Sequence, residues 1–335
     1  MRHLLAACIA APALLTACGP AQPPQPSERD IVRVAAYRSI GLAPVILANE
    51  LGYFADEGLV VQLSELRGTE GRLAAAMAGE IDVGMGVLGM GDFSSAARGI
   101  AMRSVADRTH LAPGGCAYTG FVLRPGLDSA VAGPAIRRVT LAPEGPGTFL
   151  LDRLLTAAGG SWNTVEFVRL PSAARPKAVS RGAVDLMQAE SPHLEHAAAR
   201  ATRWRNGADI IPNLQWAHVR FSERLLTTDR DVGVRFLTAY RRGIAAYHEG
   251  KTDRNVMILA RELLHDTAAV RTACWPAIRG DARLNVASML EFQDWAFRRG
   301  LLEHPARPDQ LFDTTLLASV DSLSDARAAA HSRNR

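Results

Sequence analysis

The chain has 335 residues, 48% of them hydrophobic, and a formal net charge of +4 at pH 7. This length can bury the cores of two lobes, and the apolar fraction is typical of a globular protein. The positive charge comes almost wholly from arginine, since Lys177 and Lys251 are the only lysines, and no basic stripe is interleaved with aromatic residues. The composition therefore argues against a nucleic-acid partner.

The N-terminal residues have the pattern of an export signal. A short charged start precedes an apolar run over residues 4–14, which is too short to span a bilayer, and a small-residue processing site follows at 15–18. The pattern closely resembles a bacterial lipobox. That resemblance implies removal of residues 1–17 and lipidation of Cys18, which would hold the protein to a membrane without a spanning helix. The alternative is an ordinary secretory signal that contains a cysteine.

Local patterns predict the elements that follow. Residues 18–30 are rich in proline, have no apolar period and are predicted to be an extended tether. Alternating apolar and polar residues at 31–37 predict the first strand. Pro44 suits the first turn of a helix that ends near Leu51, and Gly52 is predicted to cap that helix in the left-handed conformation.

A first lobe is expected to begin with residues 31–119. Its remaining strands are predicted at 59–66, 81–85 and 102–107, with a helix at 70–78. The glycine-rich segment 84–92 should form a loop over a cleft, where backbone approaches a ligand closely.

A second lobe is expected at 120–215, entered through a crossing strand at 117–123. Its other strands are predicted at 138–142, 165–170 and 184–189, and its helices after Gly147, after the capping residue Ser172, and at 193–200. Short strands at 209–211 and 216–220 should return the chain to the first lobe. Two such crossings would form a hinge.

The C-terminal part, residues 216–320, is expected to add helices to the first lobe. These helices are predicted at 232–248, 254–264, 267–275, 285–299 and 308–317, with Gly300 as a stop signal. Residues 321–335 should form a flexible tail.

The two halves of the chain share one plan. An apolar helix ended by a glycine, an alternating strand, a second helix ended by a glycine and a short closing strand occur at 42–86 and again at 148–190. An α/β unit used twice suggests two lobes that face each other across a cleft. Ligands of open α/β sheets bind where strand ends meet helix starts, so the cleft is predicted to hold a small molecule.

Two turns are candidates for an anionic group of that molecule. Residues 144–148 follow a strand and open a helix, where exposed N–H groups and the helix dipole favour an anion and Thr148 can cap or donate its hydroxyl. The alternative is a tight turn that only starts a helix. The matching turn in the first half is 38–42, where Arg38 either contributes charge to the same anion or is a solvated surface arginine.

Other polar residues have two interpretations each. Glu190 ends a strand and either pairs with an amino or guanidino group of the ligand or caps the next helix. Trp216 either stacks on an apolar part of the ligand or packs at the hinge. His193 and His196 share one helical face, but no third ligand stands nearby, which favours an exposed face over a metal site.

The two cysteines of the folded body, Cys116 and Cys274, are predicted to be buried thiols, although export would permit a disulfide between them. No G-x-S-x-G segment, P-loop lysine motif or paired His and Cys nucleophile occurs. Neither an enzyme nor a cofactor is therefore expected.

The segment LGYFADEGLVVQL, together with AGEIDVGMG, closely resembles the hallmark of the substrate-binding proteins of ABC importers. Within these proteins, the resemblance is to the group that binds nitrate, sulfonates and taurine. This group also includes thiamine-pyrimidine-synthase-like proteins. Further similar segments are GPGTFLLDRLLTAAG, VRLPSAARPKAVSRGAVDL, the Glu-Ser-Pro at 190–192, LNVASMLEFQDWAFRRGLL and PDQLFD. The resemblance covers nearly all of residues 31–320.

The resemblance implies an α/β, type II periplasmic-binding-protein fold, whose two lobes close on a solute and present it to permease and ATPase subunits. It implies an exported, monomeric protein in the periplasm or at the cell surface. The family's ligand contacts come from the loops after the first and third strands and from the facing ends in the second lobe. With Trp216 added to these positions, the expected ligand-binding residues are Tyr37, Arg38, Ser39, Gly41, Leu42, Met85, Gly86, Leu88, Gly147, Thr148, Glu190 and Trp216.

Two departures from the family pattern bear on the solute. Ser191 stands before Pro192, and the loop after the third strand carries the bulky apolar side chains of Val87, Leu88 and Met90. These favour a larger organic solute, sulfonate-, taurine- or pyrimidine-like, over nitrate. The other two hypotheses are an enzyme on the same fold, of the pyrimidine-synthase or menaquinone-pathway type, and a solute-sensing lipoprotein.

Overall fold

The computed structural model describes residues 27–65, 75–100, 102–263 and 265–333. The predicted export signal, the predicted lipidation site Cys18 and most of the predicted tether lie outside these residues. Of the helix predicted at 70–78, only residues 75–77 are described as helical. None of the described helices combines the length and the apolar character needed to cross a bilayer.

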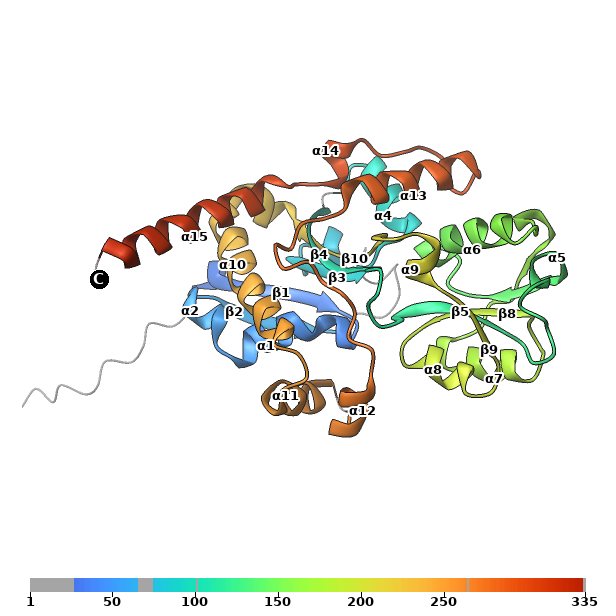
Figure 1. The fold of residues 1–335 in the computed structure, drawn as a ribbon. Coiled ribbons are helices and arrows are strands. Elements are labelled where there is room, and N and C mark those ends of the chain that lie inside the picture. Colours follow the sequence, from blue (N-terminus) through green and yellow to red (C-terminus); the bar gives the residue numbers. More distant parts are fainter. Residues whose placement is uncertain (1–26, 66–74, 101, 264, 334–335) are drawn as a thin grey trace, which may run out of the picture.

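The described residues form two separate five-stranded sheets, each covered by helices (Figure 1). The first sheet has the order β2-β1-β3-β10-β4, in which β1 runs parallel to β2 and β3 while β10 runs antiparallel to β3 and β4. Its strands are β1 (Ile31–Ala36), β2 (Val60–Ser64), β3 (Val83–Val87), β4 (Met102–His110) and β10 (Gln215–Ser222).

The second sheet has the order β7-β6-β8-β5-β9, with β6 parallel to β7 and β8 and with β5 antiparallel to β8 and β9. Its strands are β5 (Thr119–Leu123), β6 (Arg138–Thr140), β7 (Glu166–Phe167), β8 (Leu186–Glu190) and β9 (Thr202–Asn206). The repeated segments at 42–86 and 148–190 fall in different sheets. The predicted architecture of two α/β lobes is confirmed.

The chain passes from the first sheet to the second at 111–118 and returns at 211–214. One strand prediction at the return is wrong, because Asp209 and Ile210 belong to the short helix α9 (Gly207–Ile210). The edge strand β9 just before it has no alternating pattern from which it could be predicted, since Trp204 is its only buried side chain.

Four helices of the first half lie close to their predicted positions, and these are α1 (Ala43–Glu50) on the first lobe and α6 (Pro146–Ala157), α7 (Arg175–Ser180) and α8 (His193–Ala198) on the second. The short helices α2 (Tyr53–Asp56), α4 (Met90–Ala97) and α5 (Ala132–Ala135) are not among the predicted elements. The prediction of a loop at 84–92 is wrong, because β3 runs through Val87 and α4 begins at Met90. Gly52 has φ +77°, as its capping role requires. The predicted cap by Ser172 is wrong, since Ser172 begins a 3₁₀ turn and Ala174 stands at the N-cap of α7.

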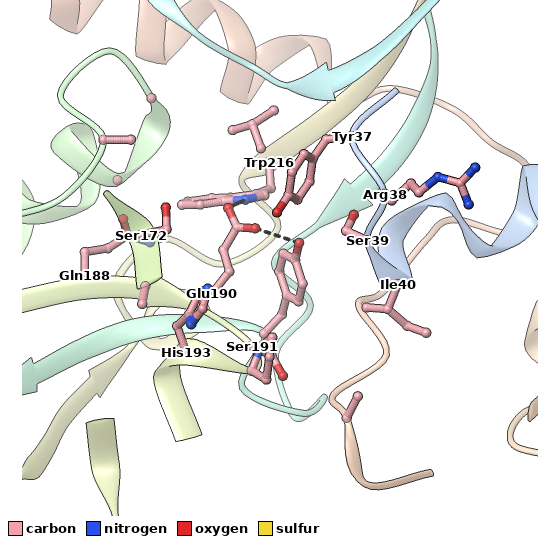
Figure 2. Close-up of a pocket in the computed structure, with 18 of the residues that line it drawn as sticks. Tyr37, Arg38, Ser39, Ile40, Ser172, Gln188, Glu190, Ser191, His193 and Trp216 are labelled. Atoms are coloured by element: carbon pink, nitrogen blue, oxygen red, sulfur yellow. Dashed lines mark hydrogen bonds between the residues drawn. The ribbon is translucent and has the colours of Figure 1, made fainter. Parts of the chain in front are cut away.

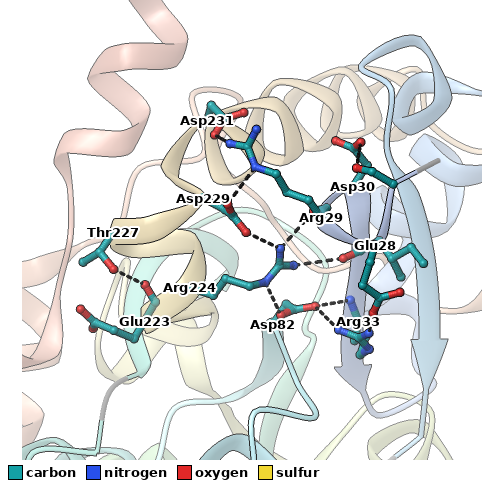
Figure 3. Close-up of polar contacts among 12 residues, drawn as sticks. Glu28, Arg29, Asp30, Arg33, Asp82, Glu223, Arg224, Thr227, Asp229 and Asp231 are labelled. Carbon is teal, nitrogen blue, oxygen red and sulfur yellow. Dashed lines mark hydrogen bonds and ion pairs between the residues drawn. The ribbon is translucent and has the colours of Figure 1, made fainter.

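The repeated Ile-Asp-Val and Val-Asp-Leu motifs have one structural role in both lobes (Figure 3 shows the first). The carboxylate of Asp82 accepts the backbone N–H of Arg33 at 2.8 Å and Nε of Arg224 at 2.9 Å. The carboxylate of Asp185 accepts the backbone N–H of Arg138 at 2.9 Å and Nε of Arg124 at 3.0 Å. Each buried aspartate thus ties its segment to the first parallel strand of its own sheet, which explains the repeat as a requirement of folding.

Most of the C-terminal helices cover the first lobe. They are α10 (Arg230–His248), α11 (Asp253–Leu263), α12 (Thr267–Thr272), α14 (Pro308–Leu311) and α15 (Thr315–Arg333). Helix α10 packs closely on α1 at Gly243, where a Cβ atom would lie 2.1 Å from the carbonyl oxygen of Pro44. Two predictions are corrected. The helix expected at 308–317 is interrupted by Phe312, which bridges to Ser104 of β4, and residues 321–333 continue α15 instead of fraying.

Helix α13 (Val286–Arg298) differs from the other C-terminal helices because it also packs on the second lobe (Figure 1). The ring of Phe292 stacks 5.8 Å from that of Phe149 in α6. Asp152, also in α6, accepts Nε1 of Trp295 at 2.7 Å and Nη2 of Arg299 at 2.7 Å. The core on this side is continuous between the lobes, so α13 holds them together beside the two crossings.

Cys116 and Cys274 form a disulfide, which corrects the prediction of two buried thiols. Cys116 lies on the first crossing and is exposed, while Cys274 follows α12 and is buried. The two segments run side by side because His110 forms an antiparallel bridge with Ala277, and this brings the two Cα atoms to 5.6 Å. The sequence separation of 158 residues concealed this proximity.

Candidate functional site

A cavity of about 450 Å³ lies between the two sheets and is lined from both lobes (Figure 2). The first lobe contributes the turn after β1 and the end of β3. The second lobe contributes the end of β8, the start of α6 and the start of α7. The residues used below are Tyr37, Ser39, Val87, Tyr118, Gly147, Ser172, Arg175, Gln188, Glu190, Ser191, His193, Trp216 and His265. A cavity walled by two lobes is the kind of site predicted from the repeated plan.

Half of the predicted binding residues line this cavity. They are Tyr37, Arg38, Ser39, Gly147, Glu190 and Trp216. The other half lie away from it, and these are Gly41, Leu42, Met85, Gly86, Leu88 and Thr148.

The register of β3 accounts for part of this difference. The strand extends through Val87 instead of ending at Met85, and Val34 and Ala36 of β1 pair with Val83 and Met85. Met85 is fully buried in the first-lobe core, whereas Val87, on the same face but at the end of the strand, is 37% exposed and lines the cavity. Leu88 is buried in the core shared by both lobes.

Other predicted binding residues that do not line the cavity make contacts inside the protein. The hydroxyl of Thr148 donates to the carbonyl oxygen of Gly145 at 2.6 Å, within the turn that starts α6. Leu42 is buried in the first-lobe core. Gly41 packs on the buried side chain of Arg108, where a Cβ atom would lie 3.4 Å from Nη2. These three residues therefore stabilise the structure behind the cavity wall and do not line the cavity.

Arg38 reaches the cavity with its backbone side, but its guanidinium points away from it (Figure 2). Nη1 of Arg38 donates to the carbonyl oxygen of Glu262, at the end of α11. Of the two interpretations of Arg38, the surface arginine is therefore the one that this geometry favours.

Glu190 is the fixed charge of the cavity. Its Oε2 accepts the hydroxyl of Tyr118 at 2.8 Å, and its Oε1 accepts Nε1 of Trp216 at 2.8 Å (Figure 2). Burial, with Glu190 beside it, raises the pKa of Tyr118 well above its ordinary value, so the hydroxyl keeps its proton and donates. Helix α8 has Pro192 at its N-cap and no side-chain cap bond, so Glu190 does not cap it.

Gln188 also lines the cavity and is 4% exposed. Its Nε2 donates to Oγ1 of Thr119 at 2.6 Å, and its Oε1 stands 2.8 Å from where a Cβ atom of Gly147 would lie. A Cβ atom at this position would force the Gln188 side chain to shift. The alternation of β8 places Gln188 on the same face as Glu190, so period 2 applied to that strand would have identified it.

Tyr118 and Arg175 carry no such signal, because Tyr118 lies in an irregular crossing and Arg175 at the start of a short helix. His193, named only as a metal candidate, also lines the cavity. Burial lowers its pKa, with His196 and Arg175 acting in the same direction and Glu190 opposing them. No group of three or more His, Cys, Asp or Glu side chains among the described residues is placed to hold a metal ion.

A Ser-His-Asp chain lies elsewhere, within the first lobe. Oγ of Ser104 is 2.7 Å from Nδ1 of His218, and Nε2 of His218 is 3.4 Å from Oδ2 of Asp92. Ser104 and His218 are 3% and 1% exposed, and none of the three residues lines the cavity. Arg220 also pairs with Asp92. A hydroxyl so enclosed is out of reach of a solute in the cavity, so the chain of contacts is structural.

The family model described as "NMT1/THI5 like" matches residues 39–250, which is more than half of the chain. The chain belongs to the NMT1/THI5-like family. This membership confirms the resemblance predicted from the sequence motifs. None of the curated protein sequences matches the chain significantly.

Solved structures share the fold of this NMT1/THI5-like chain at low sequence identity. The ligand-binding component of an ABC-type import system from Staphylococcus aureus, with zinc bound, has a TM-score of 0.69 and 14% identity, over 87% of this chain and 99% of that one. The periplasmic aliphatic sulphonate-binding protein SsuA from Escherichia coli has a TM-score of 0.68 and 15% identity, over 85% and 92%. The type II binding-protein fold is thus confirmed.

An enzyme shares the fold as well. The structure of DszB, a desulfurization enzyme, in complex with biphenyl-2-sulfinic acid has a TM-score of 0.61 and 16% identity, over 88% of this chain and 99% of that one. The fold by itself therefore serves both binding proteins and at least one enzyme.

Proposed function

We propose that this NMT1/THI5-like protein is the extracytoplasmic substrate-binding component of an ABC importer. It holds a small organic solute between its lobes and delivers it unaltered to permease and ATPase subunits. Supporting this are the family, the two-lobe fold and a cavity lined from both lobes. A ligand that touches both lobes shifts the protein toward the closed state by its difference in affinity for the two states.

The hydrogen bonding of Glu190 supports one kind of solute. Both of its oxygens accept a neutral donor, and no cationic side chain among the described residues is bonded to this carboxylate. Tyr118 and Trp216 supply aromatic surface beside it, and Tyr37, which is 59% exposed, supplies more from the first lobe. A carboxylate flanked by aromatic rings attracts an ammonium or amidine-like group. We therefore propose an amine-bearing solute with a partly apolar body.

An enzyme on the same fold is less well supported. Among the described residues that line the cavity, no hydrogen bond joins a serine or cysteine to a histidine, so the activated nucleophile used in acyl transfer is not assembled there. Cys116 and Cys274 are bound to each other.

Exchange of the Glu190 carboxylate for an amide tests the site. We expect Glu190→Gln to weaken the binding of benzylamine and 2-phenylethylamine, both cationic at neutral pH, about 10- to 100-fold, because the side-chain shape is kept while the charge is lost. Isothermal titration calorimetry measures the affinity. The matched control is Glu166→Gln, an exposed carboxylate of β7 on the same lobe. Equal affinity of wild type and Glu190→Gln for both amines would remove the amine from the proposal.

Substitution of Cys18 tests the anchor. The lipobox-like sequence supports lipidation at this residue, and the acyl chains would each contribute about 0.8 kcal/mol per buried methylene. We expect Cys18→Ala to move the protein from the membrane fraction to the soluble extracytoplasmic fraction, measured by immunoblotting of fractionated cells. Cys8→Ala, inside the apolar run of the signal, is the control and should leave the protein in the membrane fraction. A Cys18→Ala protein that stays there at full abundance contradicts the anchor.

A further inference from the structure

The second charged side chain of the cavity wall is Arg175, which the function above does not use. It stands at the start of α7 and is partly buried. Its Nε donates to the carbonyl oxygen of Leu170 at 3.1 Å, which fixes the inner end of the guanidinium. Within the described part of the chain, its two Nη atoms have no hydrogen-bond partner and no carboxylate at ion-pair distance. The guanidinium is thus held in position with its outer donors available.

Arg175 and Glu190 belong to one electrostatic site. Burial lowers the pKa of Arg175, and the nearby Glu190 carboxylate opposes that effect. Arg175 also acts on His193, which begins α8 three residues after Glu190. The other basic groups are less suited to an anion, because Arg38 is bound to Glu262 and His265 is exposed on the opposite lobe. The cavity therefore offers one fixed negative group and one unpaired positive group.

The start of α6 lies on the same wall and favours the same sign of ligand charge. Gly145, Pro146 and Gly147 line the cavity, so the first turn of a twelve-residue helix opens toward it. Gln188, which is 4% exposed, packs its Oε1 against Gly147. N–H groups at a helix start attract negative charge, and they supplement a guanidinium that already lines the site.

We propose that Arg175 binds an acid group of the solute while Glu190 binds its amine, so that the solute is a zwitterion. This inference rests on the function proposed above and adds the acid group to it. A solute with an amine alone would place a second cation beside an unpaired guanidinium when the lobes close. A solute with an acid alone would leave Glu190 without a cation. Charges taken out of water without a partner weaken binding, and a zwitterion partners both.

Calorimetric titration with matched aromatic probes tests the inference. The zwitterions are 4-(aminomethyl)benzoate, 4-(aminomethyl)benzenesulfonate and 4-(aminomethyl)phenylphosphonate, and the comparison compounds are benzylamine and benzoate. For the wild type we expect at least one zwitterion to bind about 10-fold or more tightly than benzylamine. In Arg175→Gln that preference should vanish, and the benzylamine affinity should rise, because the amine no longer lies beside a second cation. The best zwitterion also reveals which acid group the site prefers.

Two controls separate charge recognition from a structural role. Arg175→Lys keeps the charge and should retain most of the preference, and Arg169→Gln removes an exposed arginine of the same lobe and should change nothing. If no zwitterion exceeds benzylamine in the wild type, or if Arg175→Gln weakens both classes equally, the inference is overturned. If benzylamine still depends on Glu190 in that case, the amine-bearing solute stands. If benzoate binds and both the amines and the zwitterions fail, the amine assignment itself fails.

Discussion

Asp92→Asn is expected to lower the free energy of unfolding by about 3–5 kcal/mol, because it removes one partner of the ion pair with Arg220, in which each side chain is only 15% exposed. Asp92 accepts a bond from Nη1 of Arg220 and from the backbone N–H of Gly89 at 2.9 Å, and His218 lies beside it. Asparagine would leave the Arg220 guanidinium, whose Nε already has no partner, without its carboxylate. Urea unfolding followed by circular dichroism measures the change.

The matched control for Asp92→Asn is Asp309→Asn, which breaks the solvent-exposed pair with Arg307. That change should be much smaller, because water and salt screen an exposed pair. Equal effects of the two substitutions would show that the Asp92 network adds nothing beyond a surface pair.

The pH dependence of stability gives a second measure of the same network. Burial alone would raise the pKa of Asp92, but Arg220, His218 and the Gly89 amide hold it well below its ordinary value. This depressed pKa contributes stability that is present above about pH 4, the unfolded value, and that is lost as pH falls toward the folded value. Asp92→Asn should therefore lose less stability than wild type over the same fall in pH.

The titration of His218 also lowers the stability of the protein as pH falls. Burial lowers its pKa, and Asp92 opposes that shift without cancelling it. A histidine with a lowered folded pKa destabilises the protein as pH falls below about 6.5, because the unfolded chain then takes up the proton more readily. Stability should therefore decline from neutral toward acid pH, first through His218 and then through Asp92.

Removal of the disulfide by the double substitution Cys116→Ser and Cys274→Ser should lower the free energy of unfolding by about 2–5 kcal/mol. The bridge closes a long loop, with 158 residues of sequence separation, so it restricts the unfolded chain strongly. It also joins the first crossing to the segment after α12, whose neighbours Ala269, Val270 and Ala273 line the cavity. Denaturant unfolding in the presence and absence of dithiothreitol measures the effect.

The double serine variant serves as the control for reduction. Dithiothreitol should lower the stability of the wild type to that of the variant and should leave the variant unchanged. Wild-type protein that unfolds at the same denaturant concentration with and without reductant, after thiol labelling confirms reduction, would contradict a stabilising bridge.

The site shows which kinds of residue a sequence can identify. Glu190, Gly147 and Tyr37 follow recognisable local signals, a strand end, a glycine turn before a helix and the end of the first strand, and all three line the cavity. The binding role of these residues stays a prediction until the titrations above are done. Arg175 has no local signal, because an arginine at the start of a six-residue helix is ordinary unless one knows what faces it.

The sequence by itself predicts the duplicated α/β plan, the cap at Gly52 and the positions of the long helices. These features follow from the hydrophobic period and from backbone preferences that act over a few residues. The tertiary structure alone decided the disulfide, the inward face of β3, the packing of α13 on both lobes and the pairing of Tyr118 and Trp216 with Glu190. Each of these depends on segments dozens to more than a hundred residues apart. No local pattern encodes such contacts, because they arise only when the two sheets and the crossings between them pack together.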